Sequence, residues 1–153
     1  MKEVLIEIKG RQQYAHEDED VTTFTTNGTL SYENDVLILC YNESEMIGAK
    51  GVKTELIVEQ GSKMTLIRRG GMESRMIVEK GRRHSCLYNT PEGDFVIGIF
   101  GEALILELSG KGGKIYMSYT LDVNSGLLSK NIMEIKFEEI SNVKNSSTCK
   151  RTN

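Results

Sequence analysis

Five side chains between residues 68 and 119 could do chemistry: an arginine, a histidine, a cysteine and two tyrosines. Arg68 shares the alternation of Met64 and Leu66, so the pattern predicts that it points inward with them. A buried guanidinium needs a partner, and its planar fork suits a carboxylate or a phosphate. We therefore consider an anion receptor inside the protein, with Tyr88 and Tyr119 as hydroxyl donors.

The alternative for Arg68 is a structural role, in which it binds backbone carbonyls or a carboxylate such as Glu43 and plugs one end of the fold. The substitution Arg68→Met separates the two readings. A variant that keeps its stability and loses ligand binding would indicate a receptor. A loss of several kcal/mol would indicate a native ion pair left half-empty, because an unpaired buried charge is costly.

His84 lies two residues before Cys86 and on the same row, which raises the question of a nucleophilic cysteine activated by a histidine. Residues i and i+2 of a strand stand about 7 Å apart, beyond hydrogen-bond reach. His84 could also serve as a lone axial ligand to haem, but a packed thiol beside a half-exposed imidazole fits the pattern better. The candidate ligand-binding residues are thus Arg68, Tyr88, Tyr119 and His84, and we predict no catalytic residue.

Neither a metal site nor a nucleotide loop is expected. The spacing of His84 and Cys86 is not a metal signature, and the segment 110–113 (GKGG) lacks the GxxxxGK[ST] spacing of a phosphate-binding loop. The sequence therefore predicts no cofactor.

These residues are carried by short runs in which apolar and polar side chains alternate, a period of two that indicates β-strands. Glycines recur every 8 to 12 residues after position 50, a rhythm typical of strands joined by hairpins. About ten such runs follow one another with no convincing helix between them, so parallel pairing lacks its crossovers. We predict an all-β protein, one antiparallel meander closing into a barrel of about 8 to 10 strands, because closure removes the exposed edges. A sandwich is the alternative.

The strand boundaries follow from the same alternation. Residues 3–13 form the first expected strand, with Val4, Ile6 and Ile8 on its buried face. Residues 21–32 form the second, and the pair Asn27-Gly28 is interpreted as a bulge in one long bent strand in preference to a turn. Residues 102–108 (EALILEL) favour a helix by propensity, but their alternating leucines and flanking glycines favour a strand. Residues 1–140 make up the expected barrel domain, and residues 141–153 a disordered polar tail.

The composition argues against several classes of binding partner. The 153 residues carry a formal charge of −3, which argues against nucleic acid because phosphate binding needs a concentrated basic face. No run approaches the ~18 apolar residues of a membrane span, and the charged N-terminal stretch is unlike a signal peptide. The three widely separated cysteines suit reduced thiols. We expect a cytoplasmic protein with no nucleic-acid or membrane partner.

Several short motifs resemble those of the YwiB-like family of small bacterial proteins. They are Leu66-Ile-Arg68-x-Gly70, Arg75-Met76, Gly81, Tyr88-x-Thr90-x-x-Gly93, Tyr119-x-Leu121 and Tyr41-x-Glu43. The resemblance runs from Val4 to Glu138 and implies a calycin-like, lipocalin-type barrel. That family is a domain of unknown function, so the resemblance carries over no catalytic residues.

Two functional hypotheses follow. The first is a non-catalytic binding protein that holds a small amphipathic or anionic ligand in the barrel interior, as barrels of about eight strands can. The alternative is a protein-interaction or homo-oligomeric structural module, such as a homodimer, whose barrel core is solid. Enzymatic activity is not expected.

Overall fold

The computed structural model describes residues 2–14, 18–42, 52–59, 62–70, 74–90, 92–123 and 126–140. For residues 87–90 and 127 it describes the backbone only. The predicted tail, residues 141–153, lies outside the described residues.

Strands account for nearly all of this structure. They are β1 (Lys2–Tyr14), β2 (Asp20–Glu33), β3 (Val36–Asn42), β4 (Lys53–Glu59), β5 (Lys63–Arg69), β6 (Ser74–Glu79), β7 (Arg83–Thr90), β8 (Gly93–Ser109), β9 (Gly112–Val123) and β10 (Gly126–Glu139). They form one ten-stranded sheet in the order β6-β5-β4-β3-β2-β1-β10-β9-β8-β7. Each neighbouring pair in it is antiparallel. The predicted all-β antiparallel meander is therefore confirmed.

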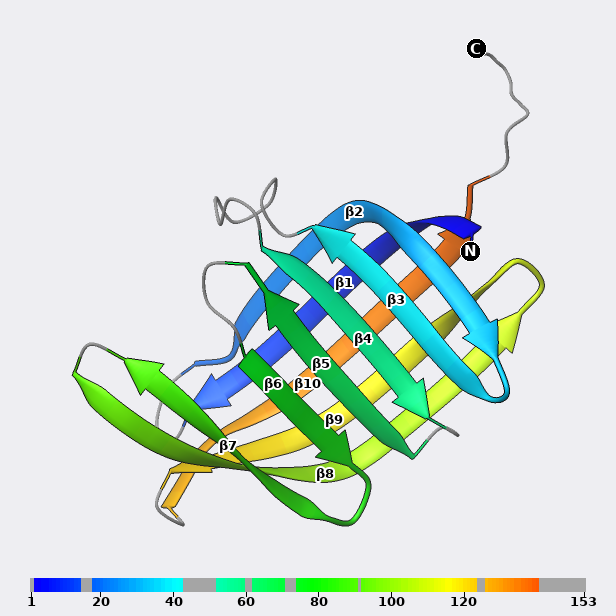
Figure 1. The fold of residues 1–153 in the computed structure, drawn as a ribbon. Coiled ribbons are helices and arrows are strands. Elements are labelled where there is room, and N and C mark those ends of the chain that lie inside the picture. The colour runs from blue at the N-terminus through cyan, green and yellow to red at the C-terminus, as the bar shows by residue number, and fades with distance from the viewer. Residues whose placement is uncertain are drawn as a thin grey trace.

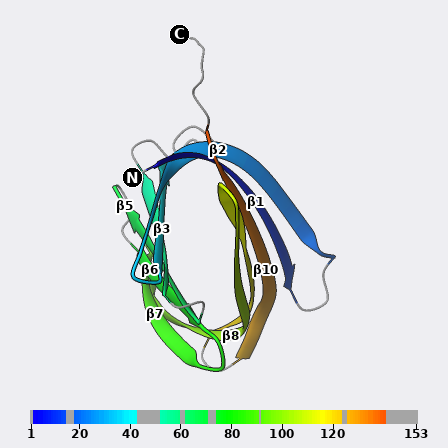
Figure 2. The ribbon, with the colours of Figure 1, turned by 90° about the vertical axis from the view of Figure 1, so that its right-hand side faces the viewer.

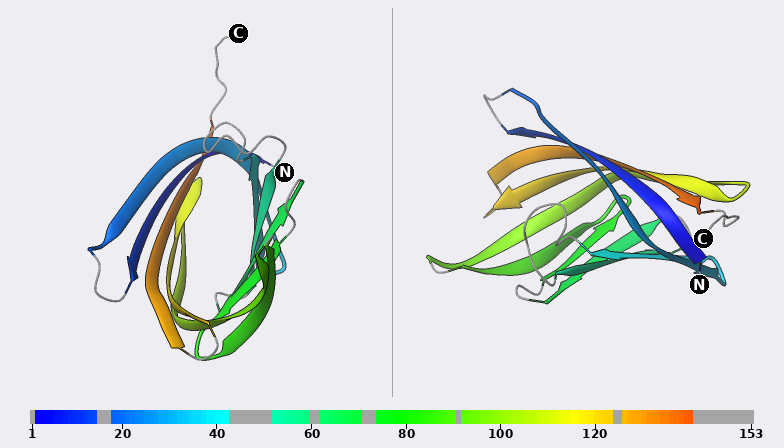
Figure 3. Two further views of the ribbon diagram at one scale, coloured as in Figure 1. Left: turned by 90° about the vertical axis from the view of Figure 1, so that its left-hand side faces the viewer. Right: turned by 90° about the horizontal axis from the view of Figure 1, so that it is seen from above.

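The sheet curls on itself until it nearly closes into a barrel (Figure 1). Seen from the side, β3, β5 and β6 form one wall, β10 and β8 lie in the opposite wall, and β2 passes over the top (Figure 2). The left view of Figure 3 shows the same flattened cross-section from the other side, and the right view shows the strands from above. β1 and β10, which hold the two ends of the described chain, are paired side by side through Val4 and Glu139.

The inward rows of both walls meet in one core, as the alternation predicted. Its fully buried members include Val4, Ile6, Leu37, Leu39, Leu56, Val58, Met64, Val78, Ile99, Ile115, Met117 and Ile135. Burying a side chain of this size contributes about 1.5–3 kcal/mol, so these rows dominate the stability. Within the described residues, no helix is both long and apolar enough to cross a membrane.

β2 is one continuous strand, and its close approach to β1 and β3 requires a glycine at position 28. A Cβ atom on Gly28 would lie 2.2 Å from the carbonyl oxygen of Cys40 on β3 and 2.7 Å from the Ile6 side chain on β1. The one-long-strand interpretation of Asn27-Gly28 is confirmed, but the predicted bulge is wrong. The register with β1 runs through Gly28 without a shift, because the glycine serves close approach between strands.

β8 joins two runs that the glycine rhythm predicts to be separate strands. Residues 102–108 are strand, as expected, but Gly101 does not turn the chain. The register between β8 and β9 shifts between Gly101 and Ala103 instead, which marks a β-bulge. Gly101 thereby lies where β8 meets the chain that leaves β6.

Candidate functional site

The two edges of the sheet, β6 and β7, are consecutive strands that hardly pair. They are joined through Lys80, Gly81 and Arg82, and one isolated bridge, between Glu79 and Arg82, links them. From this turn the two strands diverge (Figure 1). The barrel therefore has a wedge-shaped seam, closed at the turn and open toward Ser74 on β6.

Backbone hydrogen bonds hold the closed end of the seam. The Gly81 N–H donates to the Gly101 carbonyl at 2.8 Å, and the Gly101 N–H donates to the Arg82 carbonyl at 3.2 Å. The approach is so close that a Cβ atom on Gly101 would lie 2.4 Å from the Glu79 carbonyl oxygen. The glycine lets the bulge of β8 dock on the turn.

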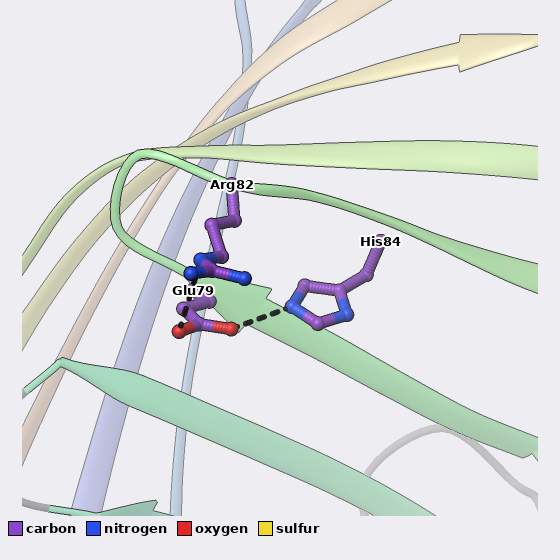
Figure 4. A network of polar contacts seen from close by, with 3 residues as sticks. All are labelled: Glu79, Arg82 and His84. Carbon is purple, nitrogen blue, oxygen red and sulfur yellow. Dashed lines mark hydrogen bonds and ion pairs between the residues drawn. The ribbon is translucent and has the colours of Figure 1, made fainter.

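A polar network of Glu79, Arg82 and His84 covers this closed end (Figure 4). The His84 Nε2 lies 2.8 Å from Glu79 Oε1, and the Arg82 Nε lies 3.8 Å from Glu79 Oε2. The hydrogen bond with His84, followed by the charge of Arg82, holds the pKa of Glu79 below its ordinary value. His84 thus has a structural partner in the described structure, and that partner is Glu79.

A pocket of about 450 Å³ occupies the open part of the seam. Its lining comes from β5, β6 and β7 and comprises Ile67, Arg68, Arg69, Ser74, Arg75, Ile77, Ser85 and Cys86. Arg68, Arg69 and Arg75 are all exposed. Arginine suits carboxylate and phosphate groups because its fork donates two parallel hydrogen bonds.

This pocket differs in charge from three other pockets that described residues line. Its lining holds three cations and no carboxylate, whereas Glu7 and Glu138 line the pocket of Lys111, Lys114 and Lys136. The pockets near Lys2 and near Arg11 likewise include Glu or Asp residues. Glu55 stands 3.8 Å from Arg69 and offsets part of the charge from outside the lining. The lining of the seam pocket nevertheless favours an anion.

Two neighbouring arginines are already engaged elsewhere. Arg83 donates to both carboxylate oxygens of Asp122, at 3.0 and 2.7 Å, and Arg82 pairs with Glu79. The bond to Asp122 raises the pKa of Arg83 further above its ordinary value. The arginines that line the seam pocket itself are Arg68, Arg69 and Arg75, and Arg69 also lies 3.8 Å from Glu55.

Arg68 lies on the inward row that the sequence predicted, opposite Thr54 on β4, and Thr54 is buried. The guanidinium is not buried, however, because Arg68 is the second-last residue of β5 and is exposed at the end of the barrel wall. The prediction of a buried arginine is wrong for that reason. Its suggested partner Glu43 lies outside the described residues.

The four candidate ligand-binding residues do not share one described pocket. Tyr119 is buried at 7 % exposure and lines a separate pocket of about 190 Å³ with Asn131. His84 belongs to the closed end of the seam. Tyr88 follows on β7, where its backbone pairs with Phe95, and its side chain lies outside the described part. Of the four, Arg68 lines the seam pocket.

The described cysteines are poorly suited to nucleophilic chemistry. Burial raises the pKa of the Cys86 thiol, and burial together with Glu55 raises that of Cys40, so both remain protonated near neutral pH. Over the described ranges, no cluster of three or more His, Cys, Asp or Glu side chains could hold a metal ion.

Sequence reasoning missed Arg75 as part of the site. Its alternation placed it on the outer surface, where a charged residue needs no explanation. The available signal was its position on β6, a strand of six residues, because short charged strands are typical of sheet edges.

Fold and site together define a single-sheet antiparallel β-barrel with a basic pocket in an open seam. The chain belongs to the DUF1934 family, a domain of unknown function, whose family model matches residues 6–135. Its fold is similar to that of the ywiB protein from Bacillus subtilis, known from a crystal structure. The two share 18% sequence identity and a TM-score of 0.77, over 92% of this chain and 93% of the other. No curated protein matches the chain.

Proposed function

We propose that this protein is a non-catalytic binding protein whose ligand carries negative charge and binds in the seam pocket. The single observation that carries the proposal is the lining of that pocket, three exposed arginines without a carboxylate. Apolar atoms of Ile67 and Ile77 lie beside them, so the ligand is anionic and partly apolar. This keeps the expected ligand chemistry and moves the site from the interior to the seam.

Dense packing of the interior supports this position. Leu39, Leu56, Met64, Ile115 and Met117 have 0–1 % exposed surface and come from opposite walls of the barrel. Large side chains packed this closely leave no space that a ligand could enter without displacing them. The same packing is also compatible with the alternative function, an interaction module with a solid barrel core.

Isothermal titration with decyl phosphate tests the proposal, with inorganic phosphate as the purely ionic probe. We expect both to bind, decyl phosphate more tightly because its chain covers Ile67 and Ile77, and both to weaken as salt screens the arginines. Arg75→Gln should weaken decyl phosphate roughly tenfold, since a hydrogen bond to a charged group contributes about 1.5–3 kcal/mol.

The matched control is Lys130→Gln, which removes an exposed cation on β10, outside the seam pocket. It should leave binding unchanged. Absence of binding by both probes, or equal losses in the two variants, would contradict the proposal.

A further inference from the structure

The edge of β6 that faces the seam has backbone groups ready for another strand. Lys80 donates its N–H to the Ser62 carbonyl at 3.0 Å, which makes Ser62 and Lys80 a hydrogen-bonded pair. In an antiparallel ladder such pairs alternate with non-bonded ones. Following the register of β5 and β6, Met64 with Val78 and Leu66 with Met76 are the next bonded pairs.

The intervening residues of β6, Arg75 and Ile77, therefore direct their N–H and C=O groups away from β5 and into the seam. Glu79 obeys the same alternation, because its carbonyl accepts the Arg82 N–H across the seam at 3.1 Å. β7 lies on the far side, and among the described residues no ladder pairs it with β6; the bridge from Glu79 ends at Arg82, one residue before β7 begins. Unpaired edges of this kind are templates for an added strand.

Charge selects the occupant. Arg75 sits on the edge itself, and Arg68 and Arg69 flank the open end of the seam, so the added strand must be acidic. The chain's own residues 141–153 contain Lys144, Lys150 and Arg151 and no carboxylate, which makes them repulsive there. Pairing of two β6 edges would bring the arginines of two copies together, which is also unfavourable.

We propose that the seam binds an extended acidic peptide segment of another protein, which adds to β6 as an antiparallel or parallel strand. The backbone groups of Arg75 and Ile77 provide main-chain hydrogen bonds, the mode known as β-augmentation. The arginines pair with carboxylates on the segment. This inference rests on the proposed function and names the chemical class of its ligand.

A capped peptide in which glutamate alternates with valine is the probe, and binding is followed by calorimetry and by amide hydrogen exchange. Four analogues separate the contributions of charge and backbone. One replaces glutamate by glutamine and one replaces it by lysine. The other two carry N-methyl groups on alternate residues, one in each of the two registers, which removes backbone donors and leaves the charge.

We expect the parent peptide to bind and to slow exchange of the Arg75 and Ile77 amides, while the core amides of β1 stay unchanged. The glutamine analogue should bind roughly tenfold more weakly or worse, and the lysine analogue should not bind. At least one of the two methylated analogues should lose binding despite its full charge.

Other outcomes overturn the inference in distinguishable ways. If both methylated registers bind like the parent, only charge is recognised, so strand addition is wrong while anion binding stands. If decyl phosphate binds and the peptide does not, the ligand is a small molecule. If neither binds, both proposals fail. Self-association that protects Ile77 without peptide would identify a second copy as the occupant and also overturn the inference.

Discussion

At the residue scale, alternation located the inward rows correctly but could not say how deep each member lies. Arg68 follows the row of Met64 and Leu66, and the register with Thr54 confirms its side of the sheet. Met64 is fully buried while Arg68 is exposed, since the first lies in the middle of the wall and the second at its end. An alternating pattern predicts which face of the sheet a side chain occupies. How deeply the side chain is buried depends on how far it lies from the end of the strand.

His84 illustrates a second limit of sequence reasoning. Its neighbour along the row, Cys86, drew attention to a catalytic pair, but its actual partner is Glu79 across a tight turn, 2.8 Å away. The pair arises because the bridge between Glu79 and Arg82 brings the ends of β6 and β7 together. The contact between Glu79 and His84 could not be predicted without knowing how β6 and β7 are placed relative to each other.

The Glu79 network predicts a specific pH dependence of stability. Because its folded-state pKa is lowered, the ionised Glu79 stabilises the fold at pH values above its ordinary pKa. That contribution disappears as the pH falls through the lowered pKa. Glu79→Gln should therefore unfold at lower urea concentration than the wild type at neutral pH, and the difference should shrink in acid.

Urea unfolding followed by tyrosine fluorescence across the acidic range checks this. Glu19→Gln is the matched control, because Glu19 is exposed and has no strand assignment, and its unfolding midpoint should track the wild type at each pH. If the difference in urea midpoint between Glu79→Gln and the wild type stays constant or grows on acidification, ionised Glu79 does not stabilise the fold as predicted.

At the element scale, the decisive feature is the docking of the β8 bulge on the turn between β6 and β7. Gly101→Ala should destabilise the protein by about 1–3 kcal/mol, since the added methyl group must displace backbone atoms of Glu79 in a packed contact. It should also speed amide exchange at Gly81, whose N–H bonds to the Gly101 carbonyl.

Gly10→Ala is the control for this substitution. A Cβ atom on Gly10 has no neighbour within 4 Å, and the residue lies inside β1, where alanine loses less entropy on folding than glycine. We expect its stability to match or slightly exceed the wild type. Equal stabilities for the two alanine variants would show that the closed end of the seam is not held at Gly101.

At the scale of the whole molecule, the fold class was predictable and the seam was not. Ten alternating runs with glycine punctuation and no crossover helices leave few arrangements other than an antiparallel meander. A simple meander pairs consecutive strands, so β6 and β7 were expected to form one more hairpin. The barrel instead stops short of full closure, and the two edges of the sheet, β6 and β7, are neighbours in sequence.

The seam gives the nearly closed barrel a basic opening. The core of the barrel is filled by rows from both walls, which supplies rigidity. The two sheet edges, β6 and β7, and the arginines of the seam pocket lie at the gap between the walls. Function is carried by such local features and not by the barrel itself, so the position of the ligand is the central claim.

The most direct measurement of that claim is a map of backbone amide NMR shifts during titration with decyl phosphate. The account predicts changes concentrated at Ile67, Arg75, Ile77 and Ser85, which line the seam pocket, with Leu39 and Ile115 unaffected. Changes concentrated at Leu39, Ile115 and their core neighbours would place the ligand inside the barrel and contradict the account.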